Sequence, residues 1–191
     1  GVVLHLCQAR QALLLQPDRV THGAQRIEQG RDVDVIPTLQ AVEHVTAAAA
    51  VLGHLHGRDT QALAKGAKLA AKAGFKTAFL SGSCVAASRL GGPDLDLISF
   101  GEMHDSLVMV RSAAPDTMVL ADGDHGYGNA MNVQRTVASY GRAGAAAVLI
   151  EDKITPRALT AAGKPCLPFE EARMKIRAAI AAAKDSGILV M

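Results

Sequence analysis

The fold is decided by the stretch Val119-Leu120-Ala121-Asp122-Gly123-Asp124-His125-Gly126-Tyr127-Gly128-Asn129, where a short apolar strand runs directly into two acids and a glycine-rich turn. A second apolar run, residues 147–150, ends in the same way at Glu151. A buried charge needs a partner or a metal, so acids that follow a strand belong at an open edge of a sheet. Strands with acids at their C-terminal ends are typical of α/β enzymes.

Strand and helix patterns alternate from residue 59 onwards, which implies a parallel sheet with right-handed crossovers. Acids at strand ends favour a (β/α)8 TIM barrel, a fold that usually takes about 250 residues. We therefore predict an α/β fold in which residues 59–191 form the first half of such a barrel. The predicted strands are 77–80, 118–121, 146–150 and 188–191, and the predicted helices are 59–73, 84–90, 100–113, 132–143 and 168–184.

Residues 1–58 differ from the rest of the chain, because they hold most of the histidines and show only weak periodicity. We treat this segment as a separate, unmatched N-terminal part with one possible helix near residues 39–52. The chain does not begin with methionine, and it stops at Met191 inside an apolar run. We therefore expect a piece of a longer protein.

Composition excludes several classes of function. Twenty basic and eighteen acidic residues are mixed along the chain and aromatic residues make up 3%, so neither a basic nucleic-acid surface nor a base-stacking platform is expected. No run approaches the roughly 18 apolar residues of a membrane span. Three widely spaced cysteines without a Cys-x-x-Cys pair suit a reducing compartment. The sequence predicts a cytoplasmic protein that binds neither nucleic acid nor membranes.

The two aspartates after the central strand are candidate metal ligands. Asp122 and Asp124 are two residues apart, so in an extended segment both carboxylates face the same side. Oxygen-only ligands suit Mg²⁺ or Mn²⁺. The alternative is a solvated Asp-Gly turn. Glu151 completes the same site from the next strand, or it is a surface acid paired with Lys153.

Two further segments carry candidate functional groups. Successive backbone N–H groups of Ser81, Gly82 and Ser83 follow the strand 77–80 and form a possible cradle for a carboxylate or phosphate; an ordinary strand–helix turn is the alternative. His125 is either a general acid or base or a histidine packed in its turn.

Residues from about 63 to 191 resemble the phosphoenolpyruvate mutase/isocitrate lyase superfamily in the order and spacing of several motifs. Those motifs are Lys68-Leu69-Ala70-Ala71-Lys72-Ala73-Gly74-Phe75, Leu80-Ser81-Gly82-Ser83, Leu90-Gly91-Gly92-Pro93-Asp94-Leu95, Asp122-Gly123-Asp124-His125-Gly126-Tyr127-Gly128-Asn129-Ala130, Ile150-Glu151-Asp152-Lys153 and Lys175-Ile176-Arg177-Ala178-Ala179.

The resemblance implies a Mg²⁺-dependent barrel enzyme that cleaves or forms a C–C or P–C bond beside a carbonyl, through a metal-stabilised enolate. Asp122 would hold the metal directly, and Asp94, Asp124 and Glu151 would support it, largely through water. The turn at 81–83, together with Asn129, would bind a small carboxylate substrate.

Departures from the family pattern narrow the expected reaction. The lyase branch carries a Lys-Cys-Gly-His segment that residues 156–164 lack, and Cys166 does not align with it. We therefore expect a decarboxylase or lyase acting on oxaloacetate-like 2-oxo or 2-hydroxy dicarboxylates, with P–C bond chemistry as the alternative. Arg157 stands where the mutase branch has a gating-loop lysine. Lys153, Arg157 and His125 are the candidate catalytic residues.

A non-catalytic fragment is the competing hypothesis, because a half barrel exposes sheet edges and apolar helix faces. Members of the superfamily are usually homo-oligomers, so the full-length protein is expected to associate with itself.

Overall fold

The computed structural model describes residues 61–156 and 165–191, all of which lie in one compact unit of the chain, Val45–Met191. The predicted boundary at residue 58 and the predicted helix at 39–52 lie outside the described residues. The elements are α3 (Ala62–Lys72), β1 (Thr77–Leu80), α4 (Gly82–Leu90), α5 (Phe100–Ala113), β2 (Met118–Asp122), α6 (Ala130–Arg142), β3 (Ala147–Leu149), α7 (Phe169–Ser186) and β4 (Leu189–Val190).

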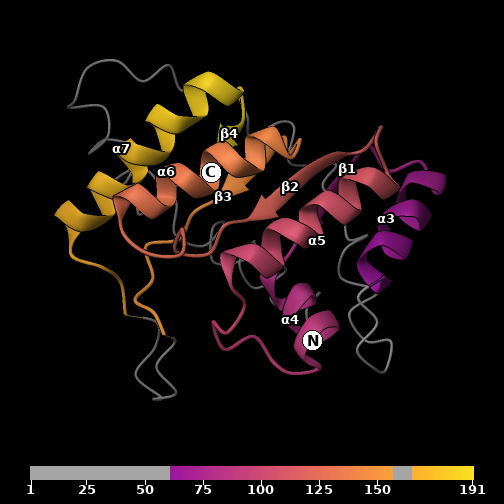
Figure 1. Cartoon of the computed structure of the whole chain (residues 1–191), viewed down its shortest axis with the longest axis horizontal. Helices are drawn as coiled ribbons and strands as arrows, with labels where there is room; N and C mark the ends of the chain where they lie inside the picture. Colours follow the sequence, from indigo (N-terminus) through magenta and orange to yellow (C-terminus); the bar gives the residue numbers. More distant parts are fainter. Residues whose placement is uncertain (1–60, 157–164) are drawn as a thin grey trace, which may run out of the picture. The chain divides into compact units, whose positions relative to one another are not determined.

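The predicted alternation of strands and helices is confirmed. The four strands form one parallel sheet in the order β1-β2-β3-β4, so each strand pairs with its neighbour in the sequence. The register sets Leu80 opposite Ala121 and Asp122 opposite Leu149. Figure 1 shows α5 and α6 running across the sheet, with α7 packed beside α6 and α3 beside α5. This is the β/α arrangement of half a TIM barrel.

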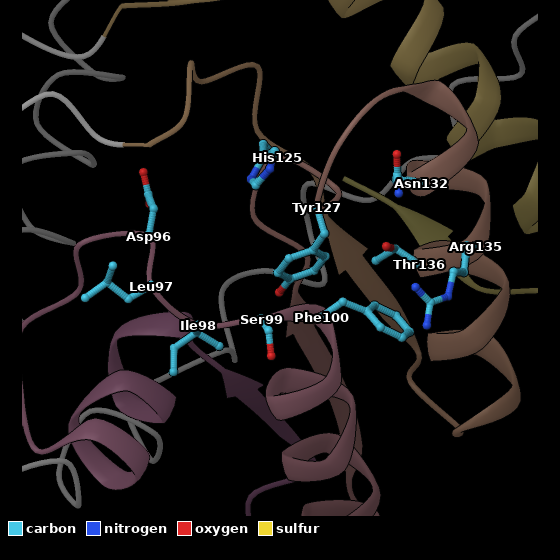
Figure 2. Close-up of a pocket in the computed structure, with 10 residues that line it drawn as sticks. All are labelled: Asp96, Leu97, Ile98, Ser99, Phe100, His125, Tyr127, Asn132, Arg135 and Thr136. Carbon is cyan, nitrogen blue, oxygen red and sulfur yellow. The ribbon is translucent and has the colours of Figure 1, made fainter.

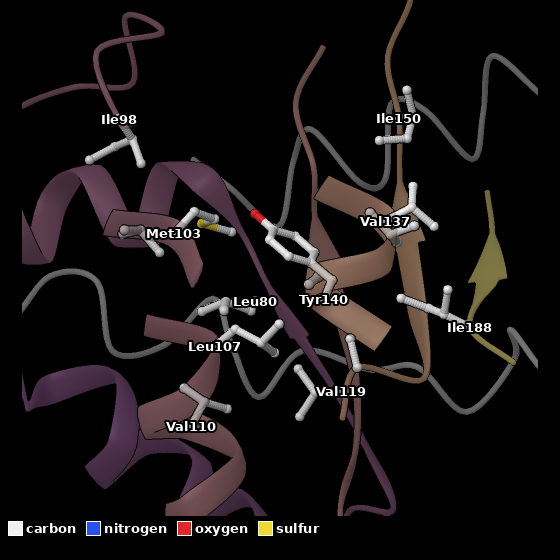
Figure 3. Close-up of a cluster of buried hydrophobic side chains, with 14 of the residues drawn as sticks. Leu80, Ile98, Met103, Leu107, Val110, Val119, Val137, Tyr140, Ile150 and Ile188 are labelled. Atoms are coloured by element: carbon white, nitrogen blue, oxygen red, sulfur yellow. The ribbon is translucent and has the colours of Figure 1, made fainter. Parts of the chain in front are cut away.

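The core lies between the sheet and this helix layer (Figure 3). Val119 and Ala121 of β2 are fully buried in it against Met103 and Leu107 of α5 and Tyr140 of α6. Side chains alternate along a strand, so Leu120 and Asp122 project from the opposite face of the sheet. The alternation of β2 therefore directs its last side chain, an acid, away from the apolar core.

Two helices begin with capping boxes that fix the loops at the C-terminal edge of the sheet. The Ser99 hydroxyl accepts a hydrogen bond from the Glu102 N–H, and the Glu102 carboxylate accepts one from the Ser99 N–H, at the start of α5. Asn129 and Asn132 exchange equivalent bonds at the start of α6. Reciprocal capping satisfies N–H groups that a helix start leaves open. The loops that lead into α5 and α6 are thereby held in place.

Candidate functional site

The polar residues singled out from the sequence gather where the parallel strands end. Ser81 follows β1, Asp122 is the last residue of β2, and Glu151 lies just beyond β3. Because all strands run in the same direction, these ends share one edge of the sheet. The Glu151 N–H donates to the Asp124 carbonyl (2.7 Å) and the Gly123 N–H donates to the Leu149 carbonyl (2.8 Å), so the loops after β2 and β3 are tied together.

Asp122 is fixed by two backbone donors. Its Oδ2 accepts from the Gly82 N–H (3.0 Å) and its Oδ1 accepts from the Asp124 N–H (3.0 Å). A Cβ atom placed on Gly82 would lie 3.2 Å from Asp122 Oδ2 and 3.5 Å from Asp124 Oδ2. The turn after β1 and both aspartates therefore meet at one point, where a side chain at position 82 would press on the Asp122 carboxylate.

The electrostatic environment of Asp122 disfavours its charge. Burial, followed by the neighbouring charge of Asp124, raises its pKa to about 6, and Glu151 adds to the rise. The hydrogen bonds from Gly82 and Asp124 act in the other direction and do not offset it. A cation stabilises carboxylates that repel one another and that accept hydrogen bonds from the backbone.

A buried lysine, Lys153, lies among the acids of this site. The Lys153 ammonium lies 2.6 Å from Asp124 Oδ1, 2.9 Å from Asp96 Oδ1 and 3.6 Å from Glu151 Oε2. The side chains of Lys153 and Asp96 are only 7% and 3% exposed. Burial alone would lower the pKa of Lys153, but the bonds to Asp124 and Asp96 outweigh it and raise the pKa. Lys153 is therefore charged throughout the physiological range.

Two tyrosines close the site from the helix side. The Tyr127 hydroxyl donates to Asp124 Oδ2 (3.3 Å), and the Tyr140 hydroxyl donates to the Asp122 carbonyl (3.3 Å); the two hydroxyls are themselves 3.3 Å apart. Burial, the largest cause, and the adjoining aspartates raise the pKa of both phenols. Both remain neutral donors that hold the turn after β2.

His125 lies at the side of a pocket of about 380 Å³ (Figure 2). The pocket is formed by the loop 96–99 with Phe100, by the turn holding Tyr127, and by the first turns of α6, where the Arg135 guanidinium covers the Phe100 ring at 4.2 Å. His125 Nδ1 is buried, with no hydrogen-bond partner among residues 61–156 and 165–191. Burial, then the charge of Lys175, lowers the His125 pKa, so the ring is neutral at pH 7.

The remaining candidates occupy different places. The Ser81 and Ser83 hydroxyls are 2.9 Å apart in the turn, while the Gly82 N–H is already bonded to Asp122. Asn129 Oδ1 accepts from the Met131 N–H (2.9 Å) as the cap of α6, a use that the sequence analysis did not foresee. Asp94 Oδ1 accepts from the Asp96 N–H (3.4 Å) in the loop before α5. Arg157 lies outside the described residues.

A metal site is not preassembled in the described part of the chain, where no three His, Cys, Asp or Glu side chains converge as ligands. The donor chemistry nevertheless fits Mg²⁺. Asp122, Asp124 and Glu151 offer only oxygen, and the charges of Asp124 and Glu151 raise the pKa of Asp122, so a divalent cation would stabilise the group. The roles of these residues as ligands remain predictions.

Sequence analysis missed Asp96. It lies two residues after Asp94 in a loop, has a left-handed backbone (φ 60°), and meets Lys153 from 57 positions away. The available signal was an acid between two leucines, Leu95 and Leu97, in the segment that follows the motif residue Asp94. That signal marks an unusual position without identifying its partner.

The raised pKa of Asp122 predicts that Mg²⁺ binding weakens in mild acid. A proton competes with the metal for the carboxylate, so the dissociation constant should rise about tenfold between pH 7.5 and pH 5, since affinity falls with the ionised fraction below the pKa. Calorimetry at constant ionic strength measures this. An unchanged dissociation constant across that range would show that Asp122 is not a ligand that titrates near pH 6.

In the part of the chain that the structure describes, no helix combines the length and apolarity that crossing a membrane requires.

Comparison with known proteins places this arrangement in a family. A family model described as phosphoenolpyruvate phosphomutase matches residues 64–191. Oxaloacetate decarboxylase of Paraburkholderia xenovorans (strain LB400) is 42% identical over 126 residues, covering 65% of this chain and 42% of that protein. The chain therefore spans less than half the length of the curated relatives it matches.

Solved structures agree. The structure of oxaloacetate acetylhydrolase in complex with the inhibitor 3,3-difluorooxalacetate superposes with a TM-score of 0.62 at 32% identity, covering 70% of this chain and 45% of that one. Phosphonopyruvate hydrolase in complex with oxalate and Mg²⁺ gives a TM-score of 0.59 at 33% identity, covering 75% and 48%. The motifs, the fold and these likenesses agree: the chain belongs to the phosphoenolpyruvate mutase/isocitrate lyase superfamily.

Proposed function

We propose that this chain carries the metal-binding half of a Mg²⁺-dependent enzyme that cleaves a C–C bond in small 2-oxo dicarboxylates, with oxaloacetate as the first candidate substrate. The observation that carries the proposal is the meeting of Asp122, Asp124 and Glu151 at one sheet edge, where the Gly82 turn lies against Asp122 at 3.0 Å. Relatives named as oxaloacetate decarboxylases, at about 40% identity, support the choice of substrate.

Each residue of the group has a distinct part in the proposed reaction. Asp122 would hold Mg²⁺ directly, and Asp124 and Glu151 would hold it mainly through water. When bound, Mg²⁺ would supply positive charge beside the oxygens of a 2-oxo carboxylate, and so would stabilise the negative charge that develops on the carbonyl oxygen when the adjacent bond breaks. The Ser81 and Ser83 hydroxyls are hydrogen-bond donors for the second carboxylate.

Proton transfer would fall to the polar groups around the acids. His125 is neutral at pH 7 and lines the pocket, so its imidazole can take up or deliver a proton. Lys153 remains charged and offsets the negative charge of the bound substrate and acids.

P–C bond chemistry is the second candidate, because phosphonopyruvate hydrolase is among the structural relatives at 33% identity. The two substrates share a 2-oxo carboxylate and differ in the group that leaves. The described residues offer no feature that separates a carboxylate from a phosphonate, so the choice rests on assay.

Parallel assays test the proposal. The chain should consume oxaloacetate faster than Mg²⁺ alone, and EDTA should remove the difference; phosphonopyruvate is assayed alongside. Spontaneous, metal-catalysed loss of oxaloacetate is subtracted with an Asp122→Asn sample at the same Mg²⁺ concentration. Turnover of phosphonopyruvate alone would transfer the proposal to P–C chemistry. Turnover of neither substrate would contradict an activity of this chain.

A further inference from the structure

Lys153 is held by acids from two separate parts of the fold. Asp124 belongs to the turn after β2, whereas Asp96 belongs to the loop that leads into α5. The two bonds, 2.6 Å to Asp124 and 2.9 Å to Asp96, are both short enough to be charge-assisted. The lysine therefore links a candidate metal-supporting acid to an acid that neither the sequence analysis nor the family motifs included.

The bond to Asp124 conflicts with the proposed use of that residue. An ammonium group and a Mg²⁺ ion are both cations, and both would draw on the Asp124 carboxylate and, at longer range, on Glu151. A buried ammonium cannot simply lose its partner, because an unpaired charge in the interior is strongly unfavourable. Mg²⁺ can take up Asp124 only if Lys153 keeps another anion.

Asp96 meets this requirement. Its side chain is 3% exposed, so its bond to Lys153 is shielded from solvent and from salt. Its position comes from a left-handed residue in a loop that is fixed at its far end by the Ser99–Glu102 capping box. Because this loop is separate from the β2 and β3 ends, Asp96 can stay on the lysine while the acids of those ends bind a cation.

We propose that Asp96 is a positioning residue for Lys153: it retains the ammonium group when a divalent cation occupies Asp124, and so prevents the lysine from competing for the metal. The inference rests on the proposed function, since it assumes that Mg²⁺ binds at Asp122 and Asp124. It adds to that function a residue that touches neither the metal nor the substrate and that acts only through Lys153.

A simpler role for Asp96 must be separated from this one. Any negative charge near a cation site strengthens binding by long-range attraction, whether or not it contacts a lysine. That effect would persist without Lys153, whereas a positioning effect would disappear. A double-mutant cycle on the two residues distinguishes them.

The experiment measures Mg²⁺ affinity by calorimetry on four versions of the 191-residue chain: unchanged, Asp96→Asn, Lys153→Met and the double variant. Asp96→Asn should weaken Mg²⁺ binding about tenfold when Lys153 is present and less than about threefold in the Lys153→Met background, since coupled neighbours differ by this order. Asp96→Glu, which keeps the charge, should restore most of the affinity. Circular dichroism confirms folding, and Asp96→Ser replaces Asp96→Asn if the latter does not fold.

The outcomes separate the inference from the proposed function. Equal losses in both backgrounds would overturn the positioning role and leave the metal site intact. Mg²⁺ binding by Lys153→Met but not by the unchanged chain would also overturn it, because the lysine would then block Asp124 despite Asp96. If none of the four chains binds Mg²⁺ better than Asp122→Asn does, the proposed function itself is refuted.

Discussion

Replacing Asp122 with asparagine should abolish Mg²⁺-dependent turnover and at the same time stabilise the metal-free fold. A metal acting as a Lewis acid contributes several kcal/mol to a transition state, so loss of the proposed direct ligand should lower the proposed activity by about 10³-fold. The asparagine has nearly the same shape and keeps one oxygen that can accept from the Gly82 or the Asp124 N–H, while its NH2 group faces the other N–H.

The gain in stability follows from the sign of the pKa shift. The folded state releases the Asp122 proton near pH 6 and the unfolded state near 3.8, so between these values the folded state binds more protons and falling pH stabilises it. Above about pH 6 the buried charge is a full penalty. Asparagine removes this penalty but loses one of the two hydrogen bonds, so the free energy of unfolding at pH 7.5 should rise by a net amount of about 1 kcal/mol.

Two measurements on one sample check this prediction, turnover with Mg²⁺ and denaturant unfolding with EDTA. Asp116→Asn is the matched control. It removes the same charge from an exposed turn residue that precedes β2, at the opposite end of the strand from Asp122. The prediction is wrong if Asp122→Asn retains Mg²⁺-dependent activity, or if it unfolds more easily than the unchanged chain in the absence of metal.

Replacing Gly123 with alanine should strongly destabilise the fold. The new Cβ would lie 2.8 Å from the Leu149 carbonyl oxygen and 2.8 Å from the side chains of Val148 and Ile150. Backbone of the next strand cannot yield without breaking the Gly123–Leu149 hydrogen bond at 2.8 Å. Overpacking of this kind costs about 3 kcal/mol. It would also separate the loops after β2 and β3 and weaken Mg²⁺ binding.

Gly92→Ala provides the control for this prediction. Nothing lies within 4 Å of a Cβ placed on Gly92, so the same methyl group should change the free energy of unfolding by less than about 1 kcal/mol. Denaturant unfolding of both variants measures the difference in their free energies of unfolding. Similar stabilities for Gly123→Ala and Gly92→Ala would mean that the two strand ends are not as close as the structure has them.

The sequence was sufficient to predict the strands because their signal is local. Residues 118–122 are apolar up to Asp122, and the buried Val119 and Ala121 alternate with side chains on the other face. The position of the acids at the strand ends could also be predicted from the sequence, because an apolar run that stops at a carboxylate marks the point where a strand ends. Helix ends were displaced by a few residues, since capping depends on side-chain geometry, as Asn129 shows.

The partners of the charged residues could not be predicted in the same way. The sequence predicts Lys153 as a catalytic group or as the partner of Glu151, yet its shortest bonds go to Asp124 and Asp96. The bond to Asp96 depends on a left-handed turn at that residue and on the approach of segments 57 positions apart. No local sequence pattern predicts this contact. The acid that a family motif includes is Asp94, which accepts a hydrogen bond from the Asp96 N–H.

The four strands have the same order in the sheet as in the chain, and this order has a consequence for biosynthesis. Each βα unit adds one strand next to the previous one and contributes one wall of the site: the serine turn after β1, the aspartates after β2, and Glu151 with Lys153 after β3. In a chain made from its N-terminus, Asp124 therefore precedes its partner Lys153 by 29 residues, and the two can meet only after the β3 unit has been made. The acidic end of β2 therefore gains its counter-charge only when the next βα unit folds against it.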